Sequence, residues 1–391
     1  MAILNYNVQA DMSTPVFWYG DLGTVDSSTI EILSGSLTGI YSGSFKYSKT
    51  GAVSGKLNSY EETYNGVSLG TAQYLNFNAA TAFYYIQILG DAQALNELIL
   101  KGNDTVYGSV YSDTLLGYKG NDTLYGFDGD DLIYGGIGND TIYGGDDNDY
   151  LLGEAGNDLI YAGSGVNLIL GGVGNDTIYG GDIMDTLSGD AGNDLIYAGS
   201  GENSIDGGVG NDTIYGGDGN DDLLGGAGND LIYAGSGANY IYGGDGNDKI
   251  YGEDGENWLI GGNGNDTIIG GSLGNYLVGG LGKDTITGGS NPDLFIFSYA
   301  ASSSNKDTIL DFQVEADGIF LDPVVFTSLT DLHEENFING PKALDGNDYL
   351  IFTKNTLYYD DDGYGSNKMQ AIAYFPGVTS LDFDNLTTVW I

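Results

Sequence analysis

The chain contains no cysteine, and all eleven of its basic residues are lysine, so arginine is also absent. Without cysteine there are no disulfides, no thiolate metal ligands and no cysteine nucleophile. Without arginine the chain lacks the forked donor with which proteins usually bind carboxylates and phosphates. The 55 acidic residues give a formal net charge of −44. We therefore expect no binding to nucleic acid or to an anionic membrane surface through electrostatics.

Long apolar runs are also absent, and a membrane-spanning helix needs about 20 apolar residues in succession. The most apolar run, residues 79–89, is too short and too rich in tyrosine. Residues 1–6 have neither a basic segment nor an apolar one, so we expect no Sec signal peptide there. The sequence thus predicts a protein that does not span a membrane.

Residues suited to catalysis are scarce. The single histidine, His333, is followed by two glutamates but lacks the second histidine of a zinc-protease motif. The stretch Gly66-Val-Ser68-Leu-Gly70 matches the elbow of serine hydrolases, yet no helical pattern follows it and the surroundings predict a hairpin turn. We therefore predict that the chain is not an enzyme. The remaining enzyme hypothesis places a site around Ser68 in the N-terminal region.

Glycine, by contrast, is abundant, with 67 residues, and much of it belongs to a nine-residue repeat. Residues 99–296 form twenty-two consecutive units without insertion or deletion, and Gly135–Tyr143 is a representative unit. Position six of every unit is Asp or Asn, and position eight is Val, Ile, Leu or Phe. Columns of this regularity indicate a solenoid whose units stack.

The repeat predicts a short strand after each turn. Position eight should point inward, whereas positions seven and nine point outward. The glycines at positions one, two and four should permit a tight turn with positive φ. Two units would make one coil of 18 residues, so the repeat predicts eleven coils, stacked at about 4.8 Å into a rod of roughly 50 Å.

The pattern G-G-x-G-x-D-x-U-x resembles the RTX, or haemolysin-type calcium-binding, repeat. This resemblance implies an all-β, right-handed parallel β-roll that binds several Ca²⁺ ions. Residues 294–322 and 357–365 are similar to the C-terminal flank of RTX proteins such as serralysin-type proteases and alginate epimerases. In that family this flank carries an uncleaved signal for the type I secretion machinery, and residues 386–391 are similar to such a signal. The resemblance thus implies an extracellular protein, secreted or held at the cell surface.

The charge pattern supports calcium independently. Stacked coils would place the position-six carboxylates about 5 Å apart, where like charges repel strongly. A divalent cation between turns would convert this repulsion into coordination by carboxylate and carbonyl oxygens. The alternative is a metal-free solenoid, which leaves the carboxylate column uncompensated. One edge of the roll carries an unbroken series of aspartates: Asp104, Asp122, Asp140, Asp158, Asp176, Asp194, Asp212, Asp230, Asp248, Asp266 and Asp284.

The opposite, mixed edge combines aspartates and asparagines. Its predicted metal ligands are Asp113, Asp131, Asp149, Asp185, Asp221 and Asp293, and its asparagines are Asn167, Asn203, Asn239, Asn257 and Asn275. Asparagine offers a neutral oxygen, so this edge either binds fewer or weaker calcium ions or forms amide ladders that need no metal. The sequence leaves these two alternatives open.

The segments before and after the repeats are both predicted to be rich in β-strands. Residues 1–98 predict a small β domain, and Asp91–Leu100 a helix that caps the open end of the roll over residues 99–296. Residues 297–391 would form the C-terminal capping and secretion-signal region. There Asp360 and Asp362 could hold one further calcium ion, although an acidic β-turn would explain the same residues.

The outward faces suggest a contact surface. Nine tyrosines recur at position nine from Tyr107 to Tyr251, and they should form a ladder that stabilises the sheet. Apolar outward faces also mark contact surfaces, covered by the terminal domains, by neighbouring molecules or by glycan stacked on tyrosine. We therefore predict a secreted structural protein that self-associates into a layer, sheath or filament. The alternative is an adhesin or a module that binds cell-surface polysaccharide.

Overall fold

The computed structural model describes residues 102–329, 332–341, 344, 347–361 and 369–388, together with the backbone of five N-terminal strands. The chain divides into two compact parts, Met1–Thr186 and Leu187–Ile391, and each is described by itself. From residue 102 onward, the described residues form strands and three short 3-10 helices. The predicted helix Asp91–Leu100 lies outside the described residues, and the predicted domain boundaries at residues 98 and 296 stay predictions.

The N-terminal strands form an antiparallel arrangement in which β2 pairs with β3, β3 with β4, β4 with β5, and β5 with β1. Strand β1 also pairs in parallel with β6, the first strand of the coils. Ser68 lies inside β5, opposite Thr63 of β4, and not at a strand-to-helix turn. The strands are β1 (Ile3–Tyr6), β2 (Thr29–Ser34), β3 (Leu37–Tyr47), β4 (Val53–Tyr64) and β5 (Val67–Gln73).

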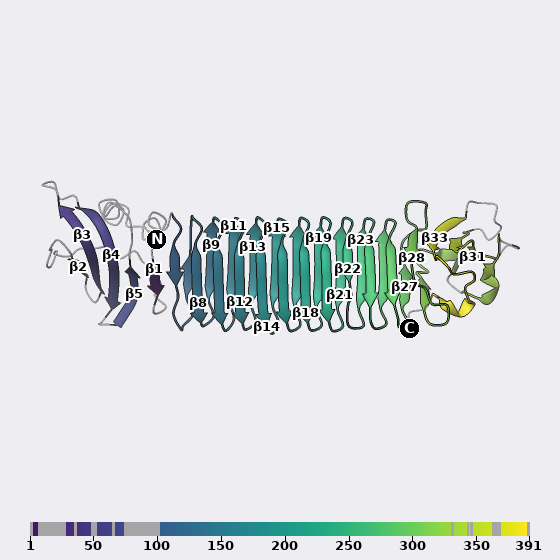
Figure 1. The fold of residues 1–391 in the computed structure, drawn as a ribbon, viewed down its shortest axis with the longest axis horizontal. Helices are drawn as coiled ribbons and strands as arrows, with labels where there is room; N and C mark the ends of the chain where they lie inside the picture. The colour runs from purple at the N-terminus through teal and green to yellow at the C-terminus, as the bar shows by residue number, and fades with distance from the viewer. Residues whose placement is uncertain are drawn as a thin grey trace. The chain divides into compact units, whose positions relative to one another are not determined.

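The coils of the first part place alternate strands in two parallel sheets (Figure 1). Each residue pairs with the residue 18 positions later, as Ile142 does with Ile160. One sheet contains β6 (Thr105–Tyr107), β8 (Thr123–Asp128), β10 (Thr141–Asp146), β12 (Leu159–Ser164) and β14 (Thr177–Asp182). The other contains β7 (Thr114–Leu116), β9 (Leu132–Ile137), β11 (Tyr150–Ala155) and β13 (Leu168–Val173).

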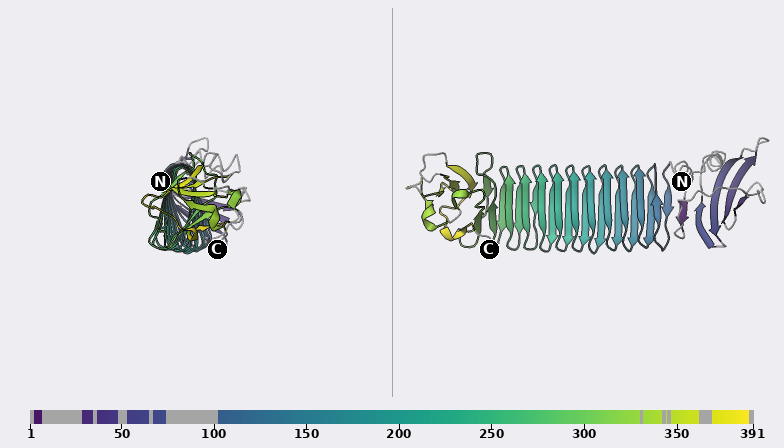
Figure 2. Two further views of the ribbon diagram at one scale, coloured as in Figure 1. Left: turned by 90° about the vertical axis from the view of Figure 1, so that its right-hand side faces the viewer. Right: turned by 180° about the vertical axis from the view of Figure 1, so that it is seen from behind.

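The second part repeats this arrangement, and Figure 2 shows its parallel strands from behind. Strand β15 (Thr186–Ala191) begins at the last residue of the first part. One sheet contains β16 (Leu195–Ser200), β18 (Thr213–Asp218), β20 (Leu231–Ser236), β22 (Lys249–Tyr251), β24 (Thr267–Gly271) and β26 (Thr285–Gly289). The other contains β17 (Ser204–Val209), β19 (Asp222–Ala227), β21 (Tyr240–Asp245), β23 (Trp258–Asn263), β25 (Tyr276–Leu281) and β27 (Leu294–Phe297). The prediction of an all-β parallel solenoid is confirmed.

Beyond the repeats, both sheets continue although the nine-residue period has ended. Strand β28 pairs in parallel with β26, and β29 with β27. Strands β33 and β34 then pair with β28 and β29, so the last described residues close the end of the sheets. The elements are β28 (Asp307–Ile309), β29 (Gly318–Leu321), η2 (Thr327–Leu329), η3 (Glu334–Asn336), β30 (Phe337–Asn339), β31 (Leu350–Thr353), β32 (Thr356–Tyr359), β33 (Gln370–Tyr374), η4 (Phe383–Asn385) and β34 (Leu386–Thr387).

The core of each coil follows the predicted alternation. Position-eight side chains such as Ile142 and Ile214 are fully buried, whereas Thr141 at position seven and Tyr143 at position nine are partly exposed. In the last coils Val278 at position nine is buried as well. The residue at position one is buried as well, so each strand turns two residues inward. Because each coil contributes so little apolar area, burial depends on the neighbouring coils.

The prediction that the position-one glycines adopt positive φ is wrong. Gly136 at position two and Gly138 at position four have φ of 108° and 142°, so these two glycines do serve the turn. Gly135 at position one does not adopt positive φ. Glycine stands there because a Cβ would lie 2.8 Å from both Oδ2 of Asp140 and the carbonyl oxygen of Gly153.

Candidate metal-binding edges

All seventeen aspartates predicted at position six are buried, with exposed fractions between 0% and 8%. Their Oδ1 atoms link successive coils. The backbone N–H of Asp104 donates to Oδ1 of Asp122 at 2.7 Å, and the N–H of Asp140 donates to Oδ1 of Asp158 at the same distance. The second part repeats this ladder, for example from Asp230 to Asp248. Carboxylates such as those of Asp122, Asp158 and Asp248 therefore have one oxygen held by the preceding coil.

The other carboxylate oxygen has a different environment. Among the described residues, twelve position-six aspartates bury Oδ2 where it accepts no hydrogen bond from the protein. These are Asp122, Asp131, Asp140, Asp149, Asp158, Asp212, Asp221, Asp230, Asp248, Asp266, Asp284 and Asp293. A buried carboxylate is strongly unfavourable unless a cation or a donor compensates its charge.

In these turns from Asp122 to Asp266, a carbonyl oxygen faces Oδ2 across the space that the position-one glycine leaves open. A Cβ on Gly207 would lie 2.8 Å from Oδ2 of Asp212 and 2.5 Å from the carbonyl oxygen of Gly225. A Cβ on Gly243 would lie 2.6 Å from Oδ2 of Asp248. Carboxylate and carbonyl oxygens thus converge on one point per turn, which is the donor set that Ca²⁺ prefers.

Burial also changes the protonation of these aspartates. Desolvation raises the pKa of Asp158 to about 8, against the lowering effect of the Asp140 N–H, and the negative charge of Asp176 raises it further. Desolvation likewise raises the pKa of Asp122 and of Asp266 to about 7 in each case. In the absence of a cation, the fold therefore favours the protonated form of these carboxyl groups.

The asparagine turns of the mixed edge satisfy both ends of the side chain. In the first part, Oδ1 of Asn167 accepts the N–H of Asp149 at 2.9 Å, and Nδ2 donates to the carbonyl of Gly165 at 3.3 Å. In the second part, Oδ1 of Asn257 accepts the N–H of Asn239, and Nδ2 donates to the carbonyl of Gly252 at 2.9 Å. This geometry favours the amide ladder over weaker calcium binding at the asparagines.

Asp113 differs from the other predicted ligands. Its Oδ2 accepts the backbone N–H of Ser109, four residues earlier, at 2.6 Å. Asp317 has the same arrangement, because its Oδ2 accepts the N–H of Gln313 at 2.7 Å. In both turns a backbone donor supplies part of the compensation that a cation would otherwise provide.

Two residues beyond the repeats extend the ladders and were missed in the sequence. The N–H of Asp284 donates to Oδ1 of Asp307, and the N–H of Asp293 donates to Oδ1 of Asp317. Insertions change the spacing to 23 and 24 residues, which hides both positions from a nine-residue count. The signal was the phrase Asp307-Thr-Ile, which repeats the Asp-Thr-Ile of many units.

The predicted C-terminal calcium site is described only in part. Asp360 is buried directly after β32, and its N–H donates to the carbonyl of Tyr349 at 2.9 Å. Asp362 lies outside the described residues. The choice between a calcium site and an acidic turn at these positions stays a prediction.

The outward tyrosines form the predicted ladder within each part. Tyr125 and Tyr143 stack with ring centroids 4.8 Å apart and planes within 3°. In the second part Tyr215 and Tyr233 stack at 4.9 Å and 4°. The ring faces are covered by neighbouring tyrosines, so edges and hydroxyls point outward. This arrangement disfavours glycan stacking on the ring faces.

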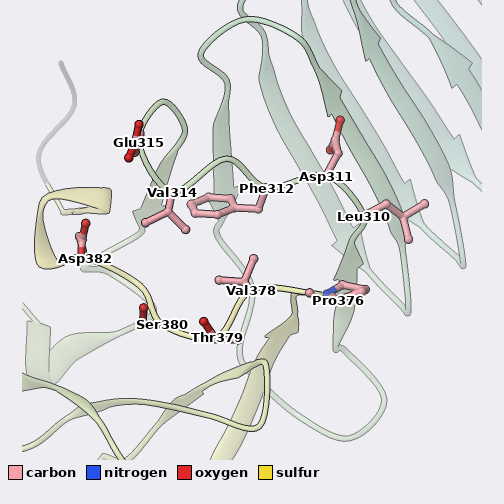
Figure 3. Close-up of a pocket in the computed structure, with 11 residues that line it drawn as sticks. Leu310, Asp311, Phe312, Val314, Glu315, Pro376, Val378, Thr379, Ser380 and Asp382 are labelled. Carbon is pink, nitrogen blue, oxygen red and sulfur yellow. The ribbon is translucent and has the colours of Figure 1, made fainter.

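A shallow cavity of about 460 Å³ lies in the second part, beside the last coils (Figure 3). Phe312, Val314 and Val378 line it, together with the carboxylates of Asp311, Glu315 and Asp382. Asp311 is already engaged, because its two oxygens accept the N–H groups of Gly288 and Gly289 at 2.9 Å. The Asp311 carboxylate therefore holds the backbone of the neighbouring turn.

Other kinds of site are absent from the described part of the chain. No three histidine or acidic side chains converge there, so a cation at the edges would need backbone carbonyls beside the aspartates. No helix in that part is long and apolar enough to cross a bilayer. The buried Oδ2 atoms and the converging carbonyls fit Ca²⁺, which would supply the positive charge that these turns lack.

The fold and these edges define a cation-binding parallel β-solenoid. Ten overlapping matches to the model of the RTX calcium-binding nonapeptide repeat, from residues 100–132 to residues 269–295, cover half of the chain. The chain belongs to this RTX repeat family.

Solved structures show weaker similarity. The AlgE6R3 subunit of the Azotobacter vinelandii mannuronan C5-epimerase is 22% identical, with a TM-score of 0.24, over 41% of this chain and 79% of that one. The extracellular lipase LipA of Serratia marcescens is 20% identical, with a TM-score of 0.22, over 57% of this chain and 39% of the lipase. Similarity at this level carries no argument about activity. A comparison with curated proteins finds no match.

Proposed function

We propose that this chain is a calcium-stabilised structural protein of the cell surface or extracellular matrix. The observation that carries the proposal is the series of buried aspartates whose Oδ2 atoms face carbonyl oxygens without a protein donor. Calcium bound at the aspartates of this series, which runs from Asp122 to Asp293, would join successive coils. Folding and metal binding would then be one process.

Export before folding follows from the same chemistry. In a cytosol with little calcium, buried carboxylates would oppose folding, and the chain would stay open for the type I secretion machinery. Calcium outside the cell would then drive folding. The family to which the repeats belong and the similarity of residues 386–391 to a secretion signal support this proposal.

Self-association is the proposed role after folding. The tyrosine ladders and the partly exposed Trp258 and Tyr276, stacked at 4.9 Å, form regular outward faces suited to contact between copies. The engaged Asp311 at the cavity and the location of Ser68 within a strand support a role without catalysis. Adhesion to a surface polysaccharide is the alternative, through the hydroxyls of the same ladders.

Calcium titration of the EDTA-treated chain tests the proposal, with circular dichroism and light scattering followed together. We expect β structure and particle size to increase over the same calcium range. Folding without growth in size would favour the polysaccharide-binding alternative. Complete β structure in EDTA at neutral pH would overturn the calcium requirement itself.

A further inference from the structure

Position one and position six of the repeat vary together. From Asp113 to Asp293, every aspartate at position six follows a glycine five residues earlier. Three of the five asparagines follow an alanine instead, in the pairs Ala162/Asn167, Ala198/Asn203 and Ala234/Asn239. These alanines are fully buried. Their methyl groups occupy the space on which a carboxylate and a carbonyl oxygen converge in the aspartate turns.

The other two asparagines follow glycine, yet their amide nitrogens take the same space. A Cβ on Gly252 would lie 3.0 Å from Nδ2 of Asn257, and one on Gly270 would lie 2.7 Å from Nδ2 of Asn275. Each nitrogen donates to a turn carbonyl, Gly252 for Asn257 and Leu273 for Asn275. A cation at this point would meet N–H groups in place of oxygen atoms.

We propose that the five asparagine turns close through their own amides and bind no calcium, and that a calcium-binding turn requires the pair of a position-one glycine and a position-six aspartate. This inference rests on the proposed function, because it divides calcium-binding turns from metal-free ones. Asn239, Asn257 and Asn275 are successive members of the mixed edge. That edge therefore includes three consecutive turns that need no metal.

The requirement for both a position-one glycine and a position-six aspartate predicts which substitutions create a calcium site in the full-length chain. Asn257→Asp should add about one calcium ion per chain, because Gly252 already leaves the space open. Asn239→Asp is the matched control and should add none, because the Ala234 methyl group fills the space. The double change Ala234→Gly with Asn239→Asp should then restore the gain. Equilibrium dialysis with calcium alone measures the number of ions bound.

The added carboxylate of Asn257→Asp could prevent folding, so a second variant tests the inference by removing a calcium site. Asp221→Asn converts a Gly216 turn into the arrangement found at Asn257, so the chain should keep its circular dichroism spectrum and lose about one calcium ion. Equal calcium counts for Asn257→Asp, Asp221→Asn and the unaltered chain would overturn the inference alone. An unaltered chain that binds no calcium would instead overturn the proposed function.

Discussion

The unbroken edge and the mixed edge of the solenoid share one backbone but differ in how their turns are closed. On the unbroken edge, a turn such as that of Asp248 leaves a buried carboxylate oxygen without a protein donor. On the mixed edge, the turn of Asn257 satisfies its side chain with two carbonyls and one N–H. The difference is one atom, oxygen or nitrogen, at the same place.

This comparison separates the stacking of the coils from the charge inside the turns. Oδ1 accepts the N–H of the preceding coil in both kinds of turn, so the parallel stacking does not depend on the choice of Asp or Asn. What the aspartate adds is an uncompensated negative charge inside the turn. Each turn therefore depends on calcium according to whether its own position-six residue is Asp or Asn.

Removing calcium should have the largest effect, and the aspartate turns should lose structure before the asparagine turns. In EDTA near pH 8, repulsion and desolvation at the aspartates should remove most of the β structure seen by circular dichroism. Hydrogen exchange at intermediate calcium should show that residues 252–257 stay protected longer than residues 243–248. Equal loss of protection at these two segments would contradict the division.

Acidification in EDTA should partly replace calcium. The folded-state pKa of Asp122 and of Asp131 is about 7, above the usual 3.8, so the folded chain binds protons more tightly than the unfolded chain. This stabilisation is complete below about pH 4 and is lost as the pH rises through about 7. Circular dichroism in EDTA should therefore show more β structure at about pH 5.5 than at pH 8. More β structure at pH 8 than at pH 5.5 would contradict the raised pKa values of these aspartates.

Gly207→Ala tests the space inside a turn of the unbroken edge. The added methyl group would lie 2.5 Å from the carbonyl oxygen of Gly225, so we expect a loss of calcium binding at this turn. Overpacking should also cost about 1–3 kcal/mol of unfolding free energy. Ala198→Gly on the mixed edge is the control, and its cost should be about 1 kcal/mol or less, with an unchanged calcium count. The comparison fails if both variants lose calcium equally.

Asn257→Ala should have the smallest effect, and this effect should not depend on calcium. The change leaves the Asn239 N–H and the Gly252 carbonyl unpaired, at a cost of roughly 1–2 kcal/mol. Asp248→Asn should be destabilising with calcium but neutral or stabilising in EDTA, because it removes a buried charge and keeps an oxygen that accepts the Asp230 N–H. Denaturant unfolding with calcium and the β signal of circular dichroism in EDTA, measured for both variants, give the four values. A calcium-dependent cost at Asn257 would show that this asparagine also binds the metal.

Much of the site was readable from residue columns. The position-eight column predicted the buried core from Val106 to Phe295, and the position-six column located every buried aspartate of the repeats. Both succeed because one period serves every coil, so a local pattern reports a contact repeated along the chain. Asp307 and Asp317 were missed because insertions shift them out of that period while the sheets still pair.

The nine-residue sequence by itself determined the solenoid, its inward position-eight residues and its acidic edges, since these follow from periodicity and charge. Only the tertiary structure decided why glycine stands at position one, because the atoms that exclude a Cβ there include the carbonyl of a residue one coil further on, as Gly153 is for Gly135. It also decided the orientation of the asparagine amides, because the N–H that fixes Oδ1 comes from the preceding coil, 18 residues away. Contacts between coils, which no single unit contains, therefore separate the turns suited to calcium from those that close without it.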